Sequence, residues 1–177
     1  MILKEDFDLA LKYLEKVQRL ANDSTTSDWM KWRYTTHLLS SFGELWLARG
    51  DLSQALSFAD RCLERATSTN SRKYIVKGRR LKAEIASARK QFQTAQVEFQ
   101  KALTLAQFIS NPTQLWRTHF AMGKYHLETG RPDKAQESYR AARDVIEGIK
   151  AGLQNSNLRN SVQNFSPVKR IYEKNRH

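Results

Sequence analysis

The sequence predicts an all-α protein built from repeated helical hairpins, and three observations lead to that fold class. Glycine and proline are scarce, with 7 and 3 in 177 residues, which leaves few breaks for the many turns of a sheet protein. Apolar residues make up 40% and charged residues 27%, which is the composition of a folded chain. Small and large side chains also recur with a shift of forty residues, and such a period indicates a repeat array.

The forty-residue repeat is clearest in its columns of small residues. Gly43, Ala83 and Gly123 share one column, and small residues where two helices cross allow the backbones to approach closely. Because the pattern returns in every unit, it predicts several hairpins of one design. Five more columns follow in the same order: Gly50, Lys90 and Gly130; Leu52, Phe92 and Pro132; Ala55, Ala95 and Ala135; Ala59, Phe99 and Tyr139; and Cys62, Ala102 and Ala142.

The chain before the first full unit is expected to form a lone helix over residues 4–21. Its apolar residues repeat the spacing of residues 52–62 with a shift of 45, so it is the second helix of an earlier unit. Because the partner helix is absent, an apolar face is left open. Three explanations remain: the chain is a fragment of a longer regulator, it forms a homodimer through this end, or the helix folds against residues 29–34. The open face is expected to contain Ile2, Leu3, Phe7, Leu14 and Val17.

Three hairpins should follow, each turning at the glycine column. Asn111 offers a helix cap and Pro112 suits a first turn, and Pro132 opens a helix in the same way. Pro167 can open a further one. Lys90 stands where the other turns have glycine, which disfavours a left-handed turn there but keeps the hairpin. The first helices are expected at 28–49, 71–89 and 112–129, and the second helices at 52–67, 92–109 and 132–150.

The order of small residue, Gly-Asp or Gly-Arg turn, Ala, aromatic residue and Ala resembles the tetratricopeptide repeat. The best stretches are FGELWLARGDLSQALSFADRCLE and MGKYHLETGRPDKAQESYRAARD, with KAEIASARKQFQTAQVEFQKALTLA between them. The resemblance covers nearly the whole chain. Its long period is similar to the variant found in the helical regions of large bacterial transcriptional activators and signalling ATPases, whose closing segment the tail also resembles.

This resemblance implies an α-solenoid, a right-handed superhelix of about three hairpins whose first helices line a concave groove for a protein or peptide. The nucleotide-hydrolysing and output domains of those regulators are not in this chain, so it is expected to be a scaffold or sensor part. The expected division is a half-repeat at 1–24, repeats within 28–150 (28–67, 71–109 and 112–150), and a capping helix near 153–164 with a basic tail within 151–177.

Positive charge is the sharpest functional signal. The chain has a formal net charge of +12, and the stretch from Arg72 to Lys90 holds eight basic residues and one acid. Lys73, Lys77 and Arg80 lie at helical spacing and form one stripe. By the forty-residue shift, the residues facing the groove are expected to be His37, Lys77 and Arg117; Ser40, Arg80 and Phe120; and Glu44, Glu84 and Lys124.

These positions predict a site for an acidic protein or peptide partner, in which cations hold carboxylates or phosphates and Phe120 adds an apolar contact. The other interpretation is that the cations only keep long helices soluble. Glu44 and Glu84 replace the Asn expected for the family's clamp on C-terminal carboxylates, which disfavours that ligand. Nucleic acid is a competing partner, but no known reader motif is present. The expected partner-binding residues are Lys73, Lys77, Arg80, Arg117, Phe120 and Lys124.

No arrangement of residues points to catalysis, a cofactor or a metal. The histidines show no HExxH spacing, and His126 falls in a packing column with Trp46 and Ala86. Cys62 occupies a small-residue column, where a buried thiol is ordinary. Trp29 and Trp32 either cover the open end or contact a partner. With no signal peptide and no apolar stretch of membrane length, the chain is expected to be a cytoplasmic, non-catalytic protein.

Overall fold

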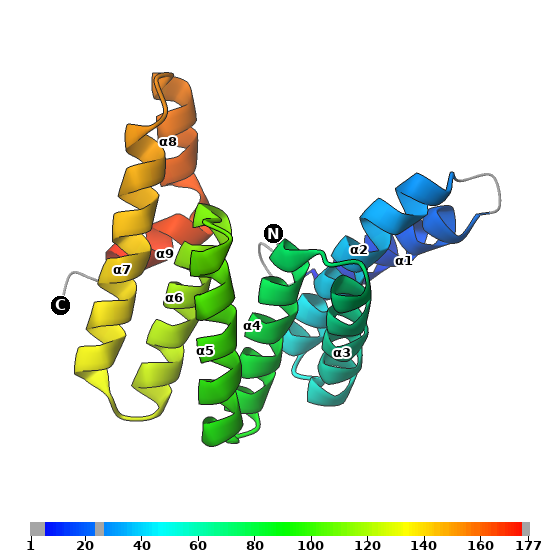
Figure 1. Ribbon diagram of the computed structural model, residues 1–177, viewed down its shortest axis with the longest axis horizontal. Helices are drawn as coiled ribbons and strands as arrows, with labels where there is room; N and C mark the ends of the chain where they lie inside the picture. The colour runs from blue at the N-terminus through cyan, green and yellow to red at the C-terminus, as the bar shows by residue number, and fades with distance from the viewer. Residues whose placement is uncertain (1–5, 24–26, 175–177) are drawn as a thin grey trace. The chain divides into compact units, whose positions relative to one another are not determined.

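The computed structural model describes residues 6–23 and 27–174, and every regular element in these residues is an α-helix (Figure 1). The predicted all-α fold of helical hairpins, of the α-solenoid class, is confirmed. The chain forms two compact units, Met1–Glu98 and Phe99–His177. The helices are α1 (Phe7–Asn22), α2 (Asp28–Arg49), α3 (Leu52–Ser68), α4 (Arg72–Ala88), α5 (Phe92–Phe108), α6 (Pro112–Glu128), α7 (Pro132–Ala151), α8 (Ser156–Asn164) and α9 (Ser166–Lys174).

Helices α2 to α6 all end in the same kind of turn. At the end of α2, the amide of Gly50 donates to the carbonyl of Leu47 and the amide of Asp51 donates to that of Trp46, at 3.1 and 3.0 Å. This pair of bonds satisfies carbonyls that the helix end leaves open, and it requires a left-handed residue. The residues with positive φ are Gly50 (84°), Asn70 (49°), Lys90 (61°), Ser110 (49°) and Gly130 (69°).

The expectation that Lys90 would disfavour a left-handed turn was wrong. Lys90 has φ of 61° and donates to the carbonyl of Ser87 at 2.8 Å, while Gln91 donates to that of Ala86 at 2.9 Å. The two hydrogen bonds and the packing of both helices hold the turn against the steric cost that a side chain adds in this conformation. The tertiary structure therefore overrides the local preference of one residue.

In the first unit, α2 and α3 form a hairpin, and α4 packs against both helices. Ala55 and Ala59 of α3 are fully buried against Leu81 and Ile85 of α4. Gly43 allows the close crossing that its column predicted, since a Cβ there would lie 2.5 Å from Cδ2 of Leu81. The small residues of the repeat thus form the interior of this unit.

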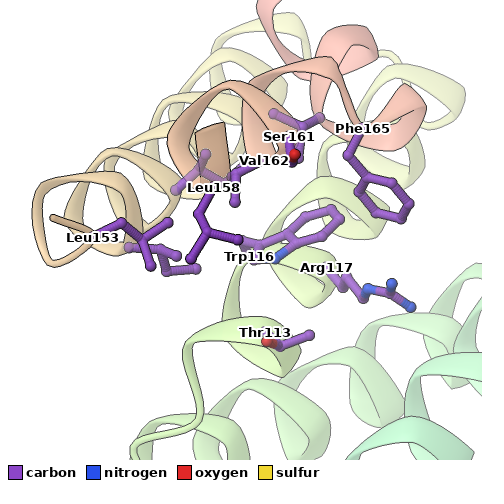
Figure 2. A pocket seen from close by; sticks show the side chains of 11 residues that line it. Thr113, Trp116, Arg117, Leu153, Leu158, Ser161, Val162 and Phe165 are labelled. Carbon is purple, nitrogen blue, oxygen red and sulfur yellow. The ribbon is translucent and has the colours of Figure 1, made fainter. Parts of the chain in front are cut away.

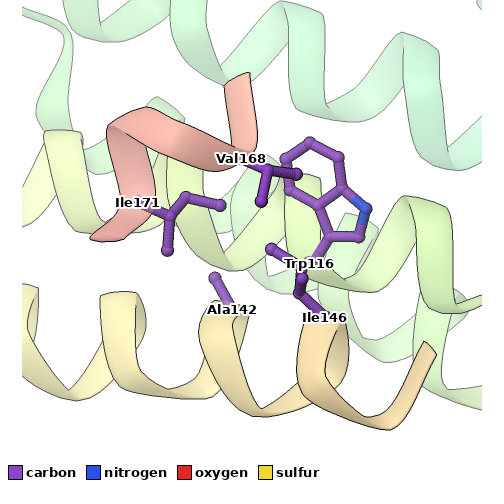
Figure 3. Packing of buried hydrophobic residues seen from close by; sticks show 5 residues of the cluster. All are labelled: Trp116, Ala142, Ile146, Val168 and Ile171. Carbon is purple, nitrogen blue, oxygen red and sulfur yellow. The ribbon is translucent and has the colours of Figure 1, made fainter. Parts of the chain in front are cut away.

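In the second unit, α6 and α7 form a hairpin, and α9 packs against α7. The core contains Trp116, Ala142, Ile146, Val168 and Ile171 (Figure 3). The expected capping helix begins at Ser156, three residues later than predicted, because the Asn155 side chain accepts from the amides of two residues that follow it. The basic tail forms α9, and Pro167 lies in its first turn.

Helix α1 packs on α2 and leaves apolar residues exposed. Of the predicted open face, Phe7 and Leu14 are half-buried and Val17 is exposed, whereas Ile2 and Leu3 lie outside the described residues. Asp8 forms an ion pair with Arg49 at 2.5 Å, which ties α1 to the end of α2. The side chains of Trp29 and Trp32 also lie outside the description. The large exposed apolar residues of α1 are Leu9, Tyr13, Val17 and Leu20.

Candidate partner-binding faces

The predicted partner-binding residues belong to two helices, one in each unit. We call Lys73, Lys77 and Arg80 the α4 face, and Arg117, Phe120 and Lys124 the α6 face. Each set has the spacing of three or four residues that places its members on one side of its helix.

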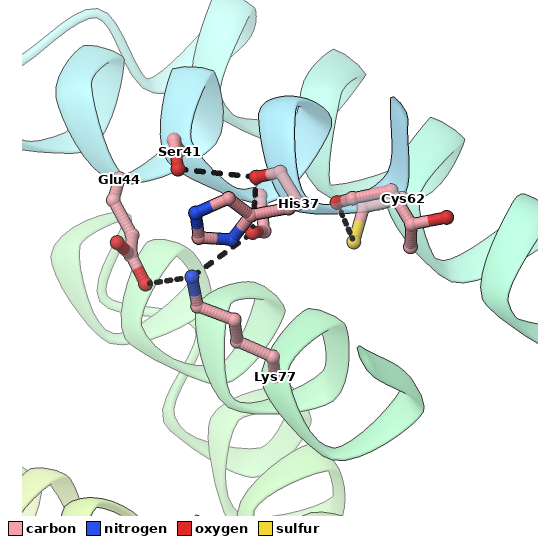
Figure 4. A network of polar contacts seen from close by, with 7 residues as sticks. His37, Ser41, Glu44, Cys62 and Lys77 are labelled. Carbon is pink, nitrogen blue, oxygen red and sulfur yellow. Dashed lines mark hydrogen bonds and ion pairs between the residues drawn. The ribbon is translucent and has the colours of Figure 1, made fainter. Parts of the chain in front are cut away.

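Lys77 of the α4 face is held inside the first unit by groups of α2. Its side chain is only 8% exposed. Its Nζ donates to Oγ of Ser40 at 2.9 Å and lies 3.2 Å from Oε1 of Glu44 (Figure 4). Burying an ammonium group requires such partners, because desolvation otherwise penalises the charge. The structure therefore brings together residues of the columns that the sequence placed side by side.

The polar contacts continue from Lys77 along α2. Ser40 and Ser41 both donate from Oγ to the carbonyl of His37, at 2.7 and 3.1 Å (Figure 4). Burial lowers the pKa of His37 below its ordinary value, and the positive charge of Lys77 lowers it further. Nearby, burial raises the pKa of the Cys62 thiol to about 11. Because Lys77 is paired and the Cys62 thiol keeps its proton near neutral pH, this network is a structural contact and is poorly suited to proton transfer.

Much of the remaining charge of α4 is also compensated within the unit. Arg79 pairs with Glu98 at 3.0 Å, and Lys82 pairs with Asp60 at 2.6 Å. Sequence analysis missed these pairs because their members are about twenty residues apart and share no column. Lys73 is exposed, with Nζ 5.6 Å from the ring centre of Tyr74, and Arg80 is 5% exposed. On the α4 face, Lys73 is therefore the cation that presents its charge to solvent.

The α6 face combines two cations with an aromatic ring. Lys124 is exposed, and its Nζ lies 4.9 Å from the ring centre of Phe120. The half-buried Phe120 packs against the core of the unit, with its ring 5.7 Å from that of Tyr139. Cζ of Arg117 lies 5.2 Å from the ring centre of Trp116. These contacts hold both cations over aromatic surfaces and leave Lys124 accessible.

Beside Arg117 the second unit contains a cavity of about 440 Å³, which the sequence did not predict (Figure 2). Its wall includes Leu158, Val162 and Phe165, which come from the segment that the repeat pattern does not cover. These three residues are four and three positions apart in the sequence, and this helical spacing indicates that the segment has one apolar side.

His119 and His126 are half-buried on α6. Burial lowers the pKa of His119 and of His126 below the ordinary value. In the part of the chain that the structure describes, no three His, Cys, Asp or Glu residues lie close enough together to hold a metal ion. Among the same residues, no helix combines the length and the apolar character needed to cross a bilayer.

Comparisons with known proteins agree with this architecture. The crystal structure of BtubC (BKLC) from P. vanneervenii is similar, with a TM-score of 0.63 and 15% sequence identity over 97% of this chain and 67% of that one. At this identity the likeness shows the fold alone. No curated protein matches the chain in sequence. Residues 74–147 match the tetratricopeptide repeat family. Through that match, the segment 74–147 is identified as one that carries tetratricopeptide repeats.

Proposed function

We propose that this chain is a non-catalytic interaction module that binds an acidic segment of a protein or peptide. The presence of tetratricopeptide repeats favours a protein partner as the general class of ligand. The observation that carries the acidic character is the α6 face, where Arg117 and Lys124 flank Phe120 on one side of the helix. A segment that alternates acidic and apolar residues matches this order of charge, ring and charge.

The six predicted residues take different parts in this proposal. Lys124 is exposed and contacts the partner's carboxylates directly, and the exposed Lys73 offers the same kind of contact on the separate α4 face. Phe120 offers the apolar contact, and Arg117 offers its planar guanidinium. Lys77 and Arg80 are buried, and Glu44 compensates the charge of Lys77, so these two residues shape the α4 face without touching the partner.

A charge reversal at Lys124 tests the proposal. The probe is a short fluorescein-labelled peptide of alternating glutamate and leucine, and binding is followed by fluorescence anisotropy at low salt. Lys124→Glu should weaken binding by about tenfold, because it replaces an attraction by a repulsion. The matched control is Lys134→Glu, an exposed residue of α7 with the same change of net charge. Equal binding by both variants and the unmodified protein would rule out the α6 face.

A variant that carries both Lys77→Glu and Arg80→Glu would be a poorer test of the proposal. Both side chains are buried, and a carboxylate at position 77 would lie beside Glu44 with no cation between them. Loss of binding in that variant would then mix a lost contact with a lost fold.

Nucleic acid is the alternative partner, favoured only by the net charge of +12. Non-specific binding to phosphates would weaken steeply as salt rises, and it would not distinguish Lys124 from Lys134. Titration of unrelated labelled duplexes at low salt decides this alternative, since a protein that leaves them unbound there is not a nucleic-acid binder.

The setting of the module belongs to the same proposal. We place it in the cytoplasm, as a scaffold or sensor part of a bacterial regulatory system or as a fragment of a longer regulator with tetratricopeptide repeats. The similarity to the long-helix variant in such regulators supports this setting. Affinity capture under native conditions, followed by mass spectrometry and retested with Lys124→Glu, would identify the partner.

A further inference from the structure

The cavity of the second unit shares Arg117 with the α6 face, but the rest of its wall takes no part in the proposed function, and its chemistry points to a ligand of its own. It lies among α6, α7, α8 and the start of α9 and has a volume of about 440 Å³ (Figure 2). That is within the range of small-molecule sites, roughly 300–1,000 Å³. Nearly all of its wall is hydrocarbon, and Arg117 is the sole charged residue among those that line it. The main apolar contributors are Trp116, Ile149, Leu153, Leu158, Val162 and Phe165.

Arg117 is poised to receive an anion. Its guanidinium is held against the ring of Trp116, with Cζ 5.2 Å from the ring centre. Its Nε is buried and has no hydrogen-bond partner among the described residues. The two Nη groups of the guanidinium form a fork that matches the two oxygens of a carboxylate.

We propose that this cavity binds a medium-chain carboxylate, with its hydrocarbon chain among α7 and α8 and its carboxylate on Arg117. The single cation beside an apolar wall calls for a ligand with one anionic end and an otherwise apolar body. A cavity of about 150 Å³ holds one benzene molecule, so a cavity almost three times as large is big enough for a chain of about ten carbons with space left over. The proposal goes beyond partner binding and does not depend on it.

Helix α8 has partly exposed apolar side chains that a ligand in the cavity would cover. No residue of α8 is fully buried. Leu158 is 53% exposed although it lines the cavity. A hydrocarbon chain would cover Leu158 and Val162, which lie four residues apart on one side of α8. Because burial of apolar surface is favourable, binding should stabilise the second unit.

Isothermal titration calorimetry with sodium decanoate, kept below its micelle concentration, tests the proposal. We expect one decanoate to bind per chain and the unfolding temperature to rise. Decan-1-ol and decyltrimethylammonium, which have the same chain and a neutral or positive head, should bind at least about tenfold more weakly. Equal affinity for the three compounds, or no heat with decanoate, would overturn the proposal.

Two variants assign the binding to this cavity. Arg117→Gln should weaken decanoate by about tenfold and leave decan-1-ol unchanged, whereas Arg140→Gln, the same change on the exposed side of α7, should leave both unchanged. Val162→Trp should fill the cavity and abolish binding of both compounds. Decanoate binding that survives Val162→Trp in a folded protein would overturn the site.

The acidic peptide separates this site from the partner-binding faces. Val162→Trp should bind the glutamate-leucine peptide as the unmodified protein does, because Val162 is on neither face. Lys124→Glu should bind decanoate normally. If Arg117→Gln does not fold, Arg117→Lys retains the charge and removes the fork, and an unchanged preference for decanoate over decan-1-ol would then show that the fork is not used.

Discussion

Cys62 shows how the packing of a single residue decides its chemistry. Its side chain is fully buried on α3, and Sγ lies 3.7 Å from the carbonyl oxygen of Thr36. Burial raises the pKa of its thiol to about 11, so very little reactive thiolate exists near neutral pH. The small-residue column predicted this position, and the structure confirms that the residue is buried.

We therefore expect Cys62 to be almost inert in the folded protein. Ellman's reagent near pH 8 should react at a rate set by opening of the fold, and the rate should rise by orders of magnitude in concentrated urea. Because the chain has 1 cysteine, the absorbance reports this residue alone. Equal rates in buffer and in urea would contradict the packing described for α3.

The three histidines with lowered pKa values predict a loss of stability in weak acid. The pKa values of His37, His119 and His126 are all lowered, chiefly by burial. Below the ordinary pKa of 6.5, these histidines bind protons in the unfolded chain but remain neutral in the folded chain. The free energy of unfolding therefore decreases as the pH is lowered. Urea unfolding at about pH 7.5 and about pH 5.5 should show this difference.

His119 provides the specific form of this experiment, because burial is the cause of its shift. His119→Gln removes the titrating group, so the variant should lose less stability than the unmodified protein between the two pH values. The window lies above the ordinary range of carboxylates, which keeps their titration out of the comparison. An unchanged pH dependence in the variant would contradict the burial of this imidazole.

Among the helices and turns, Lys90 is strained in a way that can be measured. It occupies a left-handed conformation that is unfavourable by roughly 1–2 kcal/mol for a residue with a side chain. Lys90→Gly should raise the free energy of unfolding by about 1 kcal/mol, after the greater flexibility of glycine in the unfolded chain is deducted. The denaturation midpoint in urea should rise without a change in slope.

Lys90→Ala is the matched control for this prediction. It removes the long side chain, which lies over the ring of Phe92, and leaves the Cβ that causes the strain. Alanine should therefore bring no gain. If alanine stabilises the protein as much as glycine, the cause is the side chain and not the backbone conformation.

Helix positions were more predictable than side-chain partners. Glycine, alanine and proline residues at recurring positions depend directly on backbone geometry, so they indicate where helices begin, cross and end. The observed bounds of the hairpin helices fall within one residue of the expected bounds. The pairing of Lys82 with Asp60 depends on how α4 lies against α3, which no local pattern encodes. The cavity beside Arg117 arises where α8 and α9 close the unit, in a segment without a repeat to compare.

At the scale of the whole molecule, the exposed apolar face of α1 is the surface through which the predicted homodimer would form. Leu9, Tyr13 and Val17 are exposed at spacings of four residues and form an apolar stripe on α1. The homodimer through this end stays a prediction, in which two such stripes pair and are hidden from water. A monomer of 20.6 kDa should then double its mass in light scattering as concentration rises.

Leu9→Glu with Val17→Glu should keep the protein monomeric, because two carboxylates would face each other across the stripe. Glu15→Lys, an exposed position on the side of the same helix away from the stripe, is the control for a general effect of charge. A constant monomer mass for the unmodified protein over a wide concentration range would remove the homodimer.

The left-handed residues at the ends of α2 to α6 recur at intervals of twenty. Each of these helices therefore ends at the same place within a segment of twenty residues. One residue inserted in the middle of α4 would rotate everything after it by about 100° and carry Leu81 and Ile85 off the interior. Two whole helices with their turns would restore the phase. Lineages that carry this chain should consequently differ in length by hairpins, and seldom by single residues within a helix.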